Sequence, residues 1–100
     1  MQNVVVLFSA PEFTAEDFEK VWEDLREAGH HNPMGLISHV AFSGPDGGWM
    51  VVDVWESEEA FDHFGAKLMP IIKKNKVKLP PPQVIPAHFV MVPNMEALPL

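Results

Sequence analysis

The stretch from Trp49 to Phe61 reads WMVVDVWESEEAF, and it predicts a strand that runs directly into a helix. Its first seven residues are rich in valine and tryptophan, which are typical of buried strands. Ser57 suits a helix cap, because its hydroxyl can accept a hydrogen bond from a backbone N–H of the first turn. Glu58 and Glu59 favour the same position, since negative charge is stabilised at a helix N-terminus. The strand is therefore expected to end at Trp55.

The chain before this stretch contains one more helix and two more strands. Val4 to Phe8 is a continuous apolar run, which predicts a buried central strand. A helix is expected from the cap Thr14 to the stop at Gly29. Leu36 to Phe42 reads as a second strand, and a glycine-rich turn over residues 44–48 joins it to the third as a hairpin.

The chain after this stretch predicts the end of the second helix and a last strand. Pro70 lies inside the apolar helical pattern, so it must kink the helix or restart it as a second piece. Val84 to Val92 reads as the last strand. Pro86 makes its first part a poor ladder member, which an edge position tolerates.

The resulting order is strand, helix, strand, strand, helix, strand. This split βαβ pattern predicts an α+β ferredoxin-like fold, with a four-stranded antiparallel sheet and both helices on one face. A chain of 100 residues has room for one domain, so residues 1–100 are expected to form a single unit.

Composition and charge exclude several classes of function. The chain has no cysteine, which excludes disulfides, thiolate nucleophiles and cysteine-ligated zinc or iron–sulfur sites. Its formal net charge of −7 repels phosphate backbones, so no nucleic-acid partner is expected. The N-terminus lacks the pattern of a signal peptide and no apolar run approaches the length of a membrane span, so we expect a cytoplasmic protein without a membrane partner.

The apolar pattern of the third strand predicts a homodimer. Trp49, Val51 and Trp55 lie on one face of that strand, and Met50 and its even-numbered neighbours, also apolar, lie on the other. Two helices can cover only one face, so the second face is best buried against the sheet of another copy. The alternative is a monomer whose tail, from residue 93 onward, folds over that face.

The piece Trp-Glu-Ser-x-x-x-Phe, from Trp55 to Phe61, is similar to the third strand and second helix of the dimeric α/β-barrel superfamily, which includes antibiotic-biosynthesis-monooxygenase-like proteins. The resemblance covers nearly the whole chain. It implies a cofactor-independent monooxygenase or isomerase that acts on a small aromatic or polyketide-like compound by proton abstraction. Haem-degrading members carry a histidine where this chain offers Lys74, so neither haem nor another cofactor is expected.

His39 and Asp53 are the candidate catalytic pair. If the hairpin turn spans residues 44–48, the register places His39 directly opposite Asp53. A carboxylate in an apolar strand needs a partner, and the pair would orient the imidazole and raise its basicity. A slip of one residue would separate them, and a purely structural pair at the dimer interface is the competing interpretation.

Further residues are candidates for ligand binding. In related folds a cavity lies between sheet and helices, and flat aromatic walls such as Trp22, Trp55 and Phe64 would suit an aromatic ligand. His63 is expected on the second helix, next to Phe64, and its side chain is expected to point outward more readily than inward. His88 could line a pocket or the interface. His30 and His31 are expected at the surface.

Two other functions remain open. The protein could be a non-catalytic dimer that binds a small apolar ligand or serves as an accessory subunit, in which case His39 and Asp53 only satisfy each other. A metal-dependent enzyme would need three converging ligands, and only His39, Asp53 and His88 are available for that role.

Overall fold

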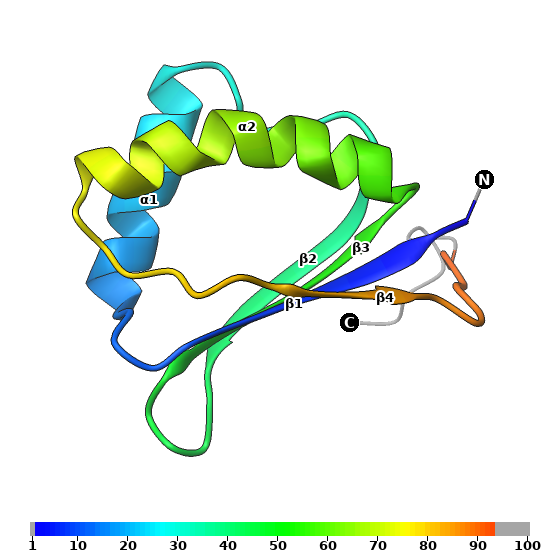
Figure 1. Ribbon diagram of the computed structural model, residues 1–100, viewed down its shortest axis with the longest axis horizontal. Helices are drawn as coiled ribbons and strands as arrows, with labels where there is room; N and C mark the ends of the chain where they lie inside the picture. Colours follow the sequence, from blue (N-terminus) through cyan, green and yellow to red (C-terminus); the bar gives the residue numbers. More distant parts are fainter. Residues whose placement is uncertain (1, 94–100) are drawn as a thin grey trace.

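A computed structural model describes residues 2–93 and contains the six expected elements. They are β1 (Val4–Ala10), α1 (Ala15–Glu27), β2 (Leu36–Ser43), β3 (Trp49–Trp55), α2 (Glu58–Lys74) and β4 (Gln83–Pro86). The strands form one antiparallel sheet in the order β2-β3-β1-β4. Figure 1 shows α1 and α2 together on one side of this sheet. The predicted α+β ferredoxin-like fold is therefore confirmed.

The two ends of α1 are closed by its own sequence. Thr14 Oγ1 accepts a hydrogen bond from the Asp17 N–H at 3.1 Å, and the Asp17 carboxylate accepts one from the Thr14 N–H at 3.0 Å. At the other end Gly29 adopts a φ of 79°, which side-chain-bearing residues rarely adopt. This turn lets the His30 N–H donate to the Leu25 carbonyl at 2.8 Å. The backbone of His30 is therefore held against the end of α1.

Helix α2 is one continuous helix from Glu58 to Lys74. Ser57 Oγ accepts from the Ala60 N–H at 3.1 Å, as expected of the cap. Of the two outcomes expected at Pro70, a restart is wrong. Pro70 is exposed and lacks only the N–H that would bond to the Ala66 carbonyl, and the surrounding turns hold the helix together. No helix within residues 2–93 has the length and apolar character needed to cross a bilayer.

The β2–β3 hairpin has the expected register. Ser43 pairs with Trp49 and His39 pairs with Asp53. A bulge at Ile37 interrupts the ladder, because Leu36 pairs with Trp55 whereas Ser38 pairs with Val54. The extra residue brings Leu36 and His39 to the same face of the sheet, although they are three residues apart.

Strand β4 is much shorter than expected. It ends at Pro86, and the prediction that it continues to Val92 is wrong. Its only partner is β1, which begins at Val4, and one further bond from the Ala87 N–H to the Asn3 carbonyl ends the pairing. The edge position expected for Pro86 is confirmed. Residues 94–100 lie outside the described part of the chain, as does most of the tail expected to cover the sheet in a monomer.

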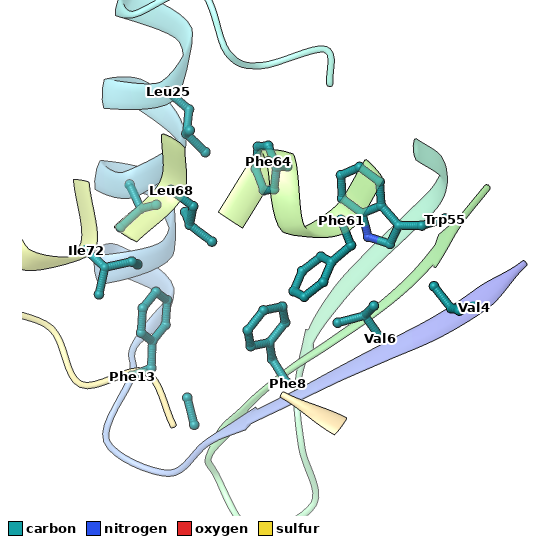
Figure 2. Close-up of a cluster of buried hydrophobic side chains, with 12 residues drawn as sticks. Val4, Val6, Phe8, Phe13, Leu25, Trp55, Phe61, Phe64, Leu68 and Ile72 are labelled. Carbon is teal, nitrogen blue, oxygen red and sulfur yellow. The ribbon is translucent and has the colours of Figure 1, made fainter. Parts of the chain in front are cut away.

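The core lies between the helices and the sheet. Figure 2 shows side chains of β1 below and those of α1 and α2 above, with Trp55 entering from the side at the end of β3. Trp55, Leu25 and Val6 are almost completely buried. The full set is Val4, Val6, Phe8, Ala10, Phe13, Val21, Leu25, Trp55, Phe61, Phe64, Leu68 and Ile72.

The opposite face of the sheet is apolar but uncovered. Val40 is 55% exposed, and Phe42 and Ile85 are similarly open to solvent. Between them lie the half-buried side chains of Val5, Leu7, Met50, Val52 and Val54. We call this surface the open face, and the helix-covered surface the closed face.

Asp24 joins the two helices. Its buried carboxylate accepts hydrogen bonds from Lys20 at 3.1 Å and from the Asn75 side chain, at the end of α2, at 2.9 Å. Lys74 lies 3.6 Å away. The bonds from Asn75 and Lys20 hold the pKa of the Asp24 carboxyl below its ordinary value, and Asp24 raises the pKa of Lys20.

Candidate functional site

The predicted His39–Asp53 pair forms across the hairpin, on the closed face. His39 Nδ1 lies 2.5 Å from Asp53 Oδ1. Asp53 Oδ2 accepts a second bond from the Trp55 indole N–H at 3.3 Å. The Asp53 side chain is only 6% exposed, so both of its oxygens have found partners inside the protein.

This geometry decides the tautomer of His39. An ionised carboxylate only accepts hydrogen bonds, so Nδ1 of a neutral imidazole carries the hydrogen and donates it to Asp53. The lone pair then lies on Nε2. His39 Nε2 is buried and has no hydrogen-bond partner among the described residues. A buried acceptor without a partner is available to a ligand or a water molecule.

Two aromatic side chains of α1 fix the orientation of the imidazole. Phe18 stacks on it with a centroid distance of 6.0 Å and an interplanar angle of 7°. Trp22 meets it edge-on at 5.2 Å. These residues are four apart in α1, so they lie on the same face of the helix, above β2. His39 is therefore held by Asp53 from the sheet and by Phe18 and Trp22 from the helix.

A cavity of about 60 Å³ lies beside this pair, between the sheet and the helices. Besides His39 and Asp53, the polar atom of interest is the Trp49 indole nitrogen, which is buried and has no partner among the described residues. The volume suffices for a few water molecules but not for a ring-sized ligand. The lining includes Phe8, Phe13, Phe18, Trp22, Leu36, Trp49, Val51, Trp55, Phe64 and Leu68.

Phe18 and Trp22 also form the route by which a larger ligand could enter. Together with His39 they line both the inner cavity and a surface groove of about 270 Å³. These two side chains therefore separate the groove from the cavity.

The predicted ligand-binding residues divide into two groups. Trp22, Trp55 and Phe64 line the cavity together with His39 and Asp53. His63 is exposed on α2 and lines a separate outer pocket. His88 is exposed and lines none of these cavities, because β4 ends before it. Within residues 2–93 no three metal-binding side chains gather, so the metal site that required His88 does not form.

Sequence reasoning missed two features of these cavities. The sequence gives no sign that the indole N–H of Trp49 lacks a partner, although strand alternation places Trp49 on the face of Asp53. His30 was expected at the surface, yet it is half-buried and lines the same outer pocket as His63. That proximity depends on how the loop after α1 meets α2, for which the sequence has no local signal.

Comparisons with known proteins agree with this architecture. Two solved structures of SnoaB, described as a cofactor-independent oxygenase from Streptomyces nogalater, are similar in fold. A single-residue variant is 16% identical with a TM-score of 0.61, covering 90% of this chain and 96% of SnoaB. A second SnoaB structure is 15% identical with a TM-score of 0.53, covering 94% and 96%. No curated protein sequence matches the chain.

The sequence itself assigns the family. The profile of the antibiotic biosynthesis monooxygenase family matches residues 1–67. This span runs from β1 through most of α2, and it includes His39, Asp53 and the aromatic side chains of α1 that contact His39. The chain therefore belongs to the antibiotic biosynthesis monooxygenase family.

Proposed function

We propose that this protein is a homodimeric, cofactor-independent monooxygenase that acts on a small aromatic or polyketide-like compound, with His39 as the general base. The observation that supports this most directly is the buried lone pair of His39 Nε2, which faces an aromatic cavity. Family membership and the fold shared with an oxygenase are consistent with it.

The proposed reaction begins with a proton transfer. His39 Nε2 removes a proton from an activated CH₂ group or a phenol of the substrate, and Asp53 stabilises the imidazolium that results. The substrate anion then gives electrons to O₂. One oxygen atom becomes the new carbonyl oxygen, on the CH₂ carbon or on a ring C–H carbon of the phenol. The other oxygen atom leaves as water, with the two hydrogens of the CH₂ group or with the ring hydrogen and the hydroxyl hydrogen of the phenol.

Trp49 supplies a second interaction in this proposal. Its indole N–H can only donate a hydrogen bond. A substrate oxygen that gains negative charge as the proton leaves would accept that bond in a cavity with little water, where such stabilisation is strongest. The substrate would thus present an oxygen to Trp49 and an acidic hydrogen to His39.

The open face supports the proposed homodimer. Its apolar side chains, with Val40 and Phe42 at one edge and Ile85 at the other, span the sheet. A second copy facing it would remove this apolar surface from water. The active sites lie on the closed faces, so each copy would carry a complete His39–Asp53 pair.

Oxygen uptake tests the proposed reaction. Wild-type protein and His39→Gln are each mixed with a panel of anthrones and naphthols, and O₂ consumption and quinone absorbance are followed. We expect at least one compound to consume one O₂ per molecule with wild-type protein and not with His39→Gln. Equal rates for both proteins on every compound would refute the assignment of the base.

The same panel distinguishes a non-catalytic binder. That alternative is favoured by Asp53, whose two oxygens are already satisfied inside the protein. A compound that quenches tryptophan fluorescence in a saturable manner, without any O₂ uptake above background, would support binding in place of catalysis.

A further inference from the structure

The outer pocket lies where the loop after α1 meets α2. Its volume is about 290 Å³, several times that of the inner cavity. His30 comes from the loop, and His63 and Lys67 come from α2 one turn apart, so both helical side chains lie on the same face. Asn32 adds an amide. Every one of these four side chains can donate a hydrogen bond.

The charge of this pocket is unlike that of the protein as a whole. The chain has a formal net charge of −7, yet no aspartate or glutamate among residues 2–93 lines the outer pocket. None of the ion pairs within residues 2–93 involves His30, His63 or Lys67. By contrast, Lys20 and Lys74 are paired with Asp24. The positive charge of Lys67 is thus available to a ligand.

The outer pocket also adjoins the inner cavity. Pro33 and Phe64 line both, so these two side chains form the wall between them. A ligand that extends across this wall would have its apolar part among the aromatic side chains of the cavity. Its other end would lie beside Lys67 and the histidines.

The backbone fixes the loop side of the pocket. The positive φ of Gly29 and the bond from the His30 N–H to Leu25 hold His30 where α1 ends. Gly35, at the end of the loop, has a φ of 90°, and a Cβ there would lie 2.6 Å from the Ala60 side chain. The loop between these glycines is therefore packed closely against the start of α2. The pocket is a built feature of the fold.

From these observations we infer that the outer pocket binds a carboxylate carried by the ligand of the inner cavity. The ligand is then an aromatic acid, with its ring near His39 and its carboxylate near Lys67, His63 and His30. This inference names the substrate class and so rests on the proposed function, but it concerns binding alone.

A matched pair of ligands tests it. Binding of 3-phenylpropanoate and of the neutral 3-phenylpropanamide is measured by quenching of tryptophan fluorescence at pH 7. Since Lys67 is exposed and partly screened, we expect the acid to bind about three- to tenfold more tightly than the amide. Lys67→Gln should remove most of this preference. Lys73→Gln, which loses the same charge on the same helix outside the pocket, should retain it.

Each other outcome overturns the inference. Equal affinity for acid and amide would show that the pocket does not recognise a carboxylate. Equal losses in Lys67→Gln and Lys73→Gln would show only a general effect of charge. Failure of both ligands to bind would remove the inner cavity as the site of the ring. The assay measures binding and not turnover, and His39 does not line the outer pocket. His39→Gln should therefore keep the preference for the acid even where oxygen uptake is lost.

Discussion

The two faces of the sheet are both apolar, but only the closed face is covered by other parts of the same chain. The closed face is covered by α1 and α2 and buries Val6 and Trp55 completely. The open face leaves Val40 and Phe42 in contact with water. A polar pair, His39 and Asp53, is present only on the closed face.

This difference fits the proposed division of roles, with assembly on the open face and chemistry on the closed face. A carboxylate on the open face would be desolvated without a partner when a second copy docked. On the closed face the same chain supplies every partner that Asp53 needs, so the pair can be kept without reference to another subunit. The following predictions, from the largest expected effect to the smallest, test whether the two faces have separate roles.

Replacement of His39 should abolish chemistry on the closed face. His39→Gln should lower kcat by about a hundred- to ten-thousandfold on any compound that the wild-type protein oxidises, because a positioned base contributes that much. Kinetics with an oxygen electrode measure this, and circular dichroism checks the fold. His31→Gln, an exposed loop histidine, is the control and should keep full activity. A loss below threefold in His39→Gln would mean that another group removes the proton.

A charge on the open face should prevent assembly. Val52 pairs with Leu7 on one side and Val40 on the other, so it lies at the centre of that face. Val52→Lys should raise the dimer dissociation constant at least about a hundredfold, since an unpaired buried charge costs several kcal/mol. Sedimentation velocity measures it. Ala66→Lys adds the same charge to the exposed side of α2 and should leave the dimer intact. Sedimentation of wild-type protein as a monomer would refute the role of the open face.

Neighbouring valines of β1 compare the two faces directly. Val6 is fully buried on the closed face, and Val5 is half-buried on the open face. Val6→Ala should lower the free energy of unfolding by about 2 kcal/mol, through lost burial and the cavity that remains. Val5→Ala should cost less than about 1 kcal/mol in dilute protein and more where the dimer forms. Urea denaturation at two protein concentrations measures the free energy of unfolding of both variants. Equal losses of stability in Val5→Ala and Val6→Ala at both concentrations would show that the two faces do not differ in this way.

The smallest effect is expected at the junction of the helices. Because the pKa of Asp24 is lower in the folded protein than in the unfolded chain, its contribution to stability is present at neutral pH. That contribution is lost as the pH falls from roughly 4 through the lowered pKa. Asp24→Asn should therefore show a lower melting temperature at pH 7 and a shallower decline in acid. Asp62→Asn, an exposed carboxyl on α2, should follow the wild-type curve.

Much of the fold was predictable because its signals are local. Thr14, Ser57 and Gly29 mark helix ends by hydrogen-bonding and backbone preferences that need no tertiary context. The register of the hairpin followed from the glycine-rich turn and from strict alternation, so the His39–Asp53 pairing was predictable too.

The features that could not be predicted depend on distant parts of the chain. The end of β4 at Pro86 is set by where β1 begins, and this is a property of its partner. His30 and His63 line the same pocket because of the way the loop packs on α2, which the sequence does not indicate. The bulge at Ile37 could not be predicted, because residues 36–38 contain no glycine or proline.

That bulge changes which face of the sheet the residues before it occupy. Leu36 and His39 both line the inner cavity, although an odd separation would place them on opposite faces of a regular strand. Deletion of Ile37 would place Leu36 two residues before His39, so a regular strand without a bulge would keep both side chains on the closed face. Among relatives, the number of residues between the glycine-rich turn and the loop before β2 thus becomes a marker that can be counted in the sequence alone. Relatives with the extra residue need the bulge to keep this wall of the cavity, and relatives without it can form the same wall from a regular strand.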